Sequence, residues 1–213
     1  GSVKCMQSML FVKPPTFQGQ AWHQDAIYIP TRDRSLIGAW IAVDDATIEN
    51  GCLWVIPGSH EHGILWPLEA QQDTRFDCTD ESQGFPYSDA DAIPVEVKAG
   101  SIVFFNGYLL HRSFPNRAKG GYRRVLVNHY MNAASLLPWK LPEGKEYMAI
   151  ADYRDVVMVA GKDPYFWKNT KDIAKPMVRP SGEGGCENWG SSREKKWAKS
   201  EVNTKQAKDV QMG

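Results

Sequence analysis

The stretch Ile37-Gly38-Ala39-Trp40-Ile41-Ala42-Val43, followed by Asn50-Gly51 and then Cys52-Leu53-Trp54-Val55-Ile56, decides the fold class of this chain. Each apolar run has the length and composition of a β-strand, and Asn-Gly is a strong turn signal before the second run. Pro57-Gly58 ends that run, because proline cannot donate a hydrogen bond to a strand ladder. Short strands with this punctuation are typical of a β-sandwich or barrel.

The same pattern extends through the first two thirds of the chain. Further strands are predicted over Cys5–Val12, Ala21–Ile29, Pro94–Lys98, Ile102–Phe105 and Tyr122–Met131. The polar, acidic segment Glu61–Ala92 is predicted to be a long loop. We therefore expect one mainly β domain with minor helices over residues 1–180 and a flexible or helical charged tail over residues 181–213. Because Met6–Val12 already looks like a buried strand, we also expect that an N-terminal part of the domain is missing from this sequence.

Composition narrows the class of protein. Twenty-five basic and 25 acidic residues give a formal net charge of zero, which argues against a dedicated nucleic-acid binder. No segment approaches the roughly 18 apolar residues of a transmembrane helix, and the N-terminus lacks the apolar core of a signal peptide. Four widely spaced cysteines are best interpreted as free thiols in a reducing cytosol. We expect a cytoplasmic protein, and the sequence leaves its oligomeric state open.

The tripeptide His23-Gln24-Asp25 is the first candidate for chemistry. Residues i and i+2 of a strand point to the same side, so His23 and Asp25 can reach one point while Gln24 is directed away. Two histidines and one carboxylate form the ligand set of non-haem Fe(II) oxygenases. The tripeptide alone is a weak signal, since a surface histidine beside an acidic residue explains it equally well.

Two downstream residues strengthen the metal hypothesis. His111 follows the apolar run Ile102–Leu110, so we place it at or just past a strand end as the third ligand. Arg123 lies on the next predicted strand, where its guanidinium can form a bidentate pair with a carboxylate. The alternative for Arg123 is an ordinary surface arginine. Arg124 is adjacent and should face the opposite way.

These residues resemble the phytanoyl-CoA dioxygenase family between about Cys5 and Pro138, and most closely its branch typified by phytanoyl-CoA dioxygenase domain-containing protein 1. The motifs that carry the resemblance are Gln7-Ser8-Met9, Trp22-His23-Gln24-Asp25, Gly38-Ala39-Trp40, the run from Glu49 to His60, and His111 with Gly121-Tyr122-Arg123. The run from Asn50 to His60 is the most distinctive of them. The resemblance implies a double-stranded β-helix, also called a jelly roll or cupin-like fold, with Fe(II) and 2-oxoglutarate as cofactor and cosubstrate.

The resemblance also implies roles for individual residues. The implied Fe(II) ligands are His23, Asp25 and His111. The implied residues of the 2-oxoglutarate pocket are Arg123, Ser113, Trp40, Met9 and Gln24. Among these, Arg123 and Ser113 would bind the distal carboxylate, Trp40 and Met9 would line the pocket, and Gln24 would help to shape the substrate side. A lysine that relatives contribute from an earlier segment has no counterpart in this chain.

The implied reaction is oxidative. A dioxygenase of this kind uses O2 to hydroxylate a C–H bond of a small-molecule or lipid-like substrate and releases succinate and CO2. Halogenating relatives replace the ligand carboxylate with a small residue, so the presence of Asp25 predicts hydroxylation. Two alternatives remain open: a catalytically inactive cupin-like binding or regulatory domain, and a zinc hydrolase on a similar jelly roll. The zinc hydrolase leaves Arg123 without a role.

Overall fold

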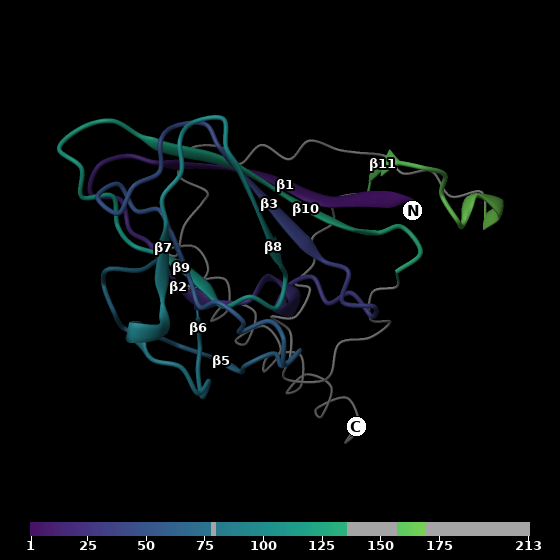
Figure 1. Ribbon diagram of the computed structural model, residues 1–213, viewed down its shortest axis with the longest axis horizontal. Helices are drawn as coiled ribbons and strands as arrows, with labels where there is room; N and C mark the ends of the chain where they lie inside the picture. The colour runs from purple at the N-terminus through teal and green to yellow at the C-terminus, as the bar shows by residue number, and fades with distance from the viewer. Residues whose placement is uncertain (78–79, 136–156, 169–213) are drawn as a thin grey trace, which may run out of the picture. The chain divides into compact units, whose positions relative to one another are not determined.

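The computed structural model describes residues 1–77, 80–135 and 157–168 (Figure 1). The predicted boundary near residue 180 and the charged tail 181–213 lie outside these residues. Among the described residues, no helix combines the length and the apolar character that crossing a bilayer requires.

Two antiparallel sheets and a small ribbon make up the fold. The larger sheet has the strand order β11-β1-β10-β3-β8, with bounds Val157–Ala160, Val3–Lys13, Arg123–Asn132, Ile37–Ala42 and Ile102–Asn106. The smaller sheet has the order β2-β9-β4-β7, with bounds Gln20–His23, His111–Ser113, Leu53–Val55 and Ile93–Val95. The ribbon pairs β5 with β6, with bounds Leu68–Glu69 and Glu81–Ser82. Short 3-10 helices are η1, η2 and η3, with bounds Asp25–Ile27, Asp89–Asp91 and Phe166–Lys168. The predicted jelly roll with minor helices is confirmed.

Strand alternation decides which side chains enter the space between the two sheets. Along β10 every second residue is buried, from Arg123 to Met131, while Arg124 faces outward and pairs with Asp44. The inward side chains meet Trp40 of β3 and Leu53 of β4 in one apolar cluster. Fully burying one large apolar side chain contributes about 1.5–3 kcal/mol, so this cluster stabilises both sheets. The predicted outward direction of Arg124 is confirmed.

Two strand boundaries beside the predicted metal ligands differ from the prediction. The strand predicted over Ala21–Ile29 ends at His23, because Asp25 begins a 3-10 turn in which the Tyr28 amide donates to the Asp25 carbonyl at 3.0 Å. His111 does not end the preceding strand but opens β9, since β8 ends at Asn106. Gln24 keeps an extended backbone, with φ −128° and ψ 126°, so the strand geometry carries on to the first residue of the turn.

Candidate metal centre

Three predicted ligands converge where β2, η1 and β9 meet. His23 and His111 are direct partners in the antiparallel pairing of β2 with β9, and Asp25 follows β2 by two residues. One ligand atom from each residue lies within 4.8 Å of the other two. The Asp25 Oδ1 atom lies 3.8 Å from His23 Nε2 and 3.6 Å from His111 Nε2. The structure therefore brings together the histidine, carboxylate and histidine that the sequence predicted as a triad.

Backbone carbonyls fix the orientation of both imidazole rings. His23 Nδ1 lies 2.8 Å from the Ala21 carbonyl oxygen, and His111 Nδ1 lies 3.0 Å from the Leu109 carbonyl oxygen. A carbonyl only accepts, so each Nδ1 carries the proton and each Nε2 keeps a lone pair for a metal. Burial, helped by the neighbouring His111, lowers the pKa of His23 to about 4 although Asp25 opposes the shift. His23 is thus neutral at pH 7, as a metal ligand must be.

A histidine from the larger sheet orients the carboxylate. His129 of β10 lies with Nε2 2.8 Å from Asp25 Oδ2, and Gln7 of β1 lies with Nε2 3.0 Å from His129 Nδ1. The Gln7 amide donates to Nδ1 and His129 donates to Oδ2, which leaves Oδ1 directed at the two ligand histidines. Burial raises the pKa of Asp25, but electrostatic attraction by the His111 and His129 rings and the hydrogen bond from His129 outweigh burial and hold that pKa below its usual range.

The donor set fits Fe(II). Two neutral imidazoles and one carboxylate form the two-histidine, one-carboxylate triad that leaves further coordination positions open. His111 and Asp25 are buried, and the side chain of His23 is 13% exposed, so the centre lies just below the surface. Phe105 packs against the His111 ring with 4.8 Å between ring centroids. This packing depends on Gly38, because a Cβ atom there would lie 2.6 Å from the Phe105 ring.

The predicted cosubstrate residues lie on inner faces of the two sheets. Arg123 is buried, with its guanidinium carbon 5.7 Å from the centre of the Trp40 ring. Met9, Val127 and Trp40 are register partners across β1, β10 and β3, so they form one row of that face. Ser113 follows His111 by two residues on β9 and therefore shares its direction. Their participation in a cosubstrate pocket stays a prediction.

Gln24 is placed differently from the other predicted pocket residues. Its buried amide donates to the carbonyl oxygens of Ile64, at 2.9 Å, and Tyr108, at 2.6 Å, and it accepts from the Trp66 amide at 2.9 Å. The side chain thus holds the loop that follows β4 and points away from the metal ligands, as the strand alternation predicted. Its participation in the cosubstrate pocket stays a prediction.

Lys13 is the residue that the sequence interpretation missed. It ends β1, is 5% exposed, and donates from Nζ to Ser113 Oγ at 3.1 Å and to the Phe114 carbonyl oxygen at 2.8 Å. In the sequence, a lysine before Pro14-Pro15 looks like the polar end of a strand, so Lys13 was not predicted to be buried between the sheets. The available signal was the period of two that places Lys13 on the same face as Met9.

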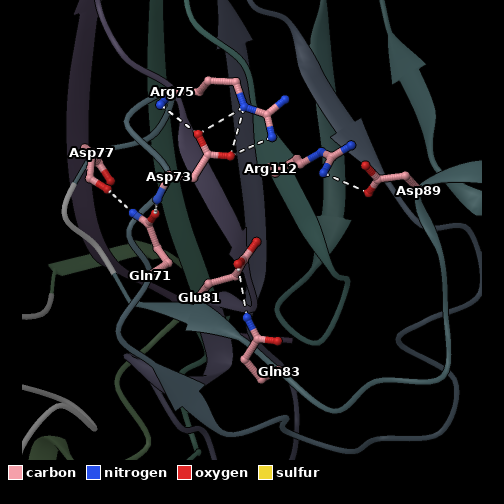
Figure 2. A network of polar contacts seen from close by, with 8 residues as sticks. All are labelled: Gln71, Asp73, Arg75, Asp77, Glu81, Gln83, Asp89 and Arg112. Carbon is pink, nitrogen blue, oxygen red and sulfur yellow. Dashed lines mark hydrogen bonds and ion pairs between the residues drawn. The ribbon is translucent and has the colours of Figure 1, made fainter.

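The back of the smaller sheet is braced by a charged and aromatic layer. Arg112, next to His111, points the other way and places its guanidinium carbon 4.4 Å from the Trp22 ring centre and 4.5 Å from the Phe114 ring centre. Figure 2 shows its ion pair with Asp89, at 2.9 Å, beside the pair of Arg75 with Asp73. A cavity of about 260 Å³ lies among these residues. The layer therefore supports the strands that carry both ligand histidines.

Comparison with known proteins agrees with this architecture. A phytanoyl-CoA dioxygenase from Arabidopsis thaliana is 40% identical over 113 residues, which are 52% of this chain and 38% of that protein. Phytanoyl-CoA dioxygenase domain-containing protein 1 from Danio rerio is 37% identical over 131 residues, which are 60% of this chain and 45% of that protein. The chain thus spans less than half the length of these curated relatives.

Solved structures share the fold. The apo form of the non-haem monooxygenase ThoJ superposes with a TM-score of 0.60 at 22% identity, covering 85% of this chain and 59% of that chain. EvdO2 from Micromonospora carbonacea var. aurantiaca, in complex with 2-oxoglutarate, gives a TM-score of 0.50 at 25% identity, covering 66% of this chain and 58% of that chain.

A family model also matches more than half of the chain. The model described as phytanoyl-CoA dioxygenase (PhyH) matches residues 2–125, a range that contains the triad, Ser113 and Arg123. The chain belongs to the phytanoyl-CoA dioxygenase (PhyH) family.

Proposed function

We propose that this protein is an Fe(II)- and 2-oxoglutarate-dependent dioxygenase that hydroxylates a C–H bond of a small-molecule or lipid-like substrate. The observation that carries the proposal is the convergence of His23, Asp25 and His111, with both Nε2 atoms free and Oδ1 directed between them. Membership of the PhyH family and the fold shared with a 2-oxoglutarate complex of EvdO2 support it.

Each side chain has a distinct task in the proposed reaction. His23, Asp25 and His111 would hold Fe(II), and His129 keeps the carboxylate oriented. When bound, Fe(II) and 2-oxoglutarate supply the oxidising chemistry, in which one O2 converts the C–H bond to C–OH and 2-oxoglutarate to succinate and CO2. Arg123 and Ser113 would bind the distal carboxylate, and Trp40 with Met9 would exclude water from the pocket.

Charge bears on the substrate class. The segment Glu61–Ala92 carries eight acidic residues and the single basic residue Arg75. Arg75 is engaged by Asp73, and Arg112 behind the segment is engaged by Asp89. Phosphate groups such as those of coenzyme A prefer unpaired basic side chains. The acidic excess favours a substrate without phosphates over an acyl-CoA.

The free thiols of Cys5 and Cys52 support a reducing compartment, and we propose the cytoplasm.

The direct test is succinate release from 2-oxoglutarate, measured with and without Fe(II) and stimulated by members of a metabolite library. We expect release that requires both Fe(II) and 2-oxoglutarate. His23→Ala, Asp25→Ala and Arg123→Ala should each reduce it to background, because the first two remove a metal ligand and the third removes the carboxylate-binding cation. His62→Ala, at an exposed histidine, is the matched control and should keep the wild-type rate.

The alternatives give different outcomes in the same assay. A non-catalytic cupin-like domain would release no succinate under any condition. A zinc hydrolase would act on its substrate without 2-oxoglutarate and would be indifferent to Arg123→Ala. Succinate release that survives His23→Ala would refute the iron assignment.

A further inference from the structure

Two buried basic side chains face one another at the end of the larger sheet. Lys13 and Arg123 are direct register partners in the pairing of β1 with β10, and they are 5% and 4% exposed. Like charges placed opposite one another on antiparallel strands destabilise the pair, and burial adds a desolvation penalty. A fold retains such a buried pair when another interaction offsets the repulsion and the desolvation penalty. Lys13 and Arg123 can therefore both be charged only when an anion supplies a counter-charge.

The described part of the chain does not supply that counter-charge by direct contact. Neither Lys13 nor Arg123 forms an ion pair with a carboxylate of the described residues, although Asp77 lies near enough to act on Lys13 through its charge. The Nε atom of Arg123 is buried without a hydrogen-bond partner among those residues. A buried guanidinium with an unused N–H is arranged for an acceptor that arrives from outside.

Ser113 connects this pair of basic side chains to the metal centre. Its hydroxyl oxygen accepts from Lys13 Nζ at 3.1 Å and from the Gln20 amide at 3.3 Å. A hydroxyl has two acceptor positions and one proton, so the proton remains to be donated to a further acceptor. Ser113 and the ligand His111 lie on one face of β9, two residues apart. Ser113 thus links Lys13 to the face of β9 that carries His111.

The turn after β3 leaves room for the lysine. Gly51 has φ +83°, and a Cβ atom at this position would come within 3.3 Å of Lys13 Nζ and against the Phe114 carbonyl. The Asn50-Gly51 turn therefore gives the amine space to reach Ser113 between the two sheets. Burial, with the charge of Arg123 adding to it, lowers the pKa of Lys13 to about 6, so the amine is poised to gain a proton when an anion approaches.

We propose that Lys13 is a second cationic ligand of the cosubstrate, which binds the distal carboxylate of 2-oxoglutarate together with Arg123 and Ser113. The inference rests on the proposed function. It adds Lys13 to the residues of this chain that are expected to bind the cosubstrate. Three converging donors on one carboxylate would distinguish a dicarboxylic 2-oxo acid from one that ends in a methyl group.

The test compares two ligands in calorimetric titrations of Mn(II)-loaded protein. 2-Oxoglutarate is one, and 2-oxopentanoate, which keeps the 2-oxo acid head and replaces the distal carboxylate with a methyl group, is the other. In Lys13→Met we expect the dissociation constant for 2-oxoglutarate to rise by about 10- to 100-fold, the loss of one charge-assisted hydrogen bond. The constant for 2-oxopentanoate should stay the same or fall.

Controls separate binding from folding. Lys98→Met removes an exposed lysine and should leave both constants at wild-type values. Lys13→Gln keeps a donor for the Phe114 carbonyl, so it serves if Lys13→Met folds poorly, and it should show the same selective loss. Equal losses for both ligands, or an unchanged constant for 2-oxoglutarate, would overturn the role of Lys13. If wild-type protein bound neither ligand, the proposed function itself would fail.

Discussion

At the level of single residues, the amine of Lys13 links folding to pH. Its pKa is lowered to about 6 in the folded protein by burial and by Arg123, with Asp77 and Cys52 acting in the opposite direction. In the unfolded chain its pKa is the ordinary value of 10.5. Between these two values the unfolded state binds more protons than the folded state, so stability rises with pH. The unfavourable contribution is complete below about pH 6 and is relieved as the pH approaches 10.5.

We therefore expect the melting temperature of the metal-free, cosubstrate-free protein to rise between pH 7 and pH 9 by more than that of Lys13→Met. The variant has no amine to deprotonate on folding, so it should also melt higher at pH 7. Differential scanning calorimetry across this range measures both effects. Lys98→Met should follow the wild-type slope, because its amine is exposed. Parallel curves for wild type and Lys13→Met would contradict the prediction.

At the level of elements, the pairing of β3 with β8 controls the shape of the metal centre. Gly38 and Phe105 are register partners, and the Phe105 ring lies where a side chain of residue 38 would be. The ring in turn packs against the imidazole of His111. A change on β3 therefore reaches a metal ligand on the opposite sheet through one aromatic ring.

Gly38→Ala should displace Phe105, lower stability by about 1–3 kcal/mol as overpacking does, and weaken metal binding. Thermal melting and competition for Mn(II) with a coloured chelator measure the two effects. Gly120→Ala is the matched control, because a Cβ atom there has open space within 4 Å. Unchanged metal affinity in Gly38→Ala would show that Phe105 does not hold His111 in place.

The sequence predicted elements well where local pattern decides them. The strands around Trp40 and Val127 follow from continuous apolar runs, and family resemblance pointed to the triad. The 3-10 turn at Asp25 was missed, because the Ala26 amide is satisfied by the distant Gly107 carbonyl at 2.9 Å. No local pattern encodes that contact.

The environment of the site was harder to predict than its ligands. The hydrogen bond from His129 to Asp25 joins residues 104 positions apart, and the one from Lys13 to Ser113 joins residues 100 positions apart. Because lysine is rarely buried in proteins, the residue type alone would have predicted an exposed side chain at Lys13. Only the register of β1 with β10 places Lys13 opposite Arg123.

At the level of the whole molecule, the metal centre joins the two sheets. His23 and His111 belong to the smaller sheet, whereas His129 of the larger sheet holds Asp25. A bound metal ion therefore adds a connection between the two layers, beside their apolar packing and the hydrogen bond from Lys13 to Ser113. Ligands that bind only the folded state stabilise it by mass action.

Removal of the metal with a chelator should consequently lower the melting temperature. At a free metal concentration 100 times the dissociation constant the stabilisation is about 2.7 kcal/mol. For a protein of this size that corresponds to a shift of roughly 5–11 °C, given about 2–4 °C per kcal/mol. Asp25→Ala serves as the control and should melt at the same temperature with and without chelator. A wild-type protein that ignores the chelator would speak against a stabilising metal.

The position of Ser113 two residues after His111 has a consequence for ligand length. β9 is hydrogen-bonded to β2 on one side and to β4 on the other, so its pitch of about 7 Å per two residues cannot stretch. For the proposed cosubstrate, this strand spacing would set the distance between the group bound at the metal and the distal carboxylate. A diacid one methylene shorter would fall short of Lys13, and one methylene longer would have to buckle. On the proposed role of Lys13, we expect selection of a five-carbon diacid to depend on this strand spacing more than on the surrounding loops.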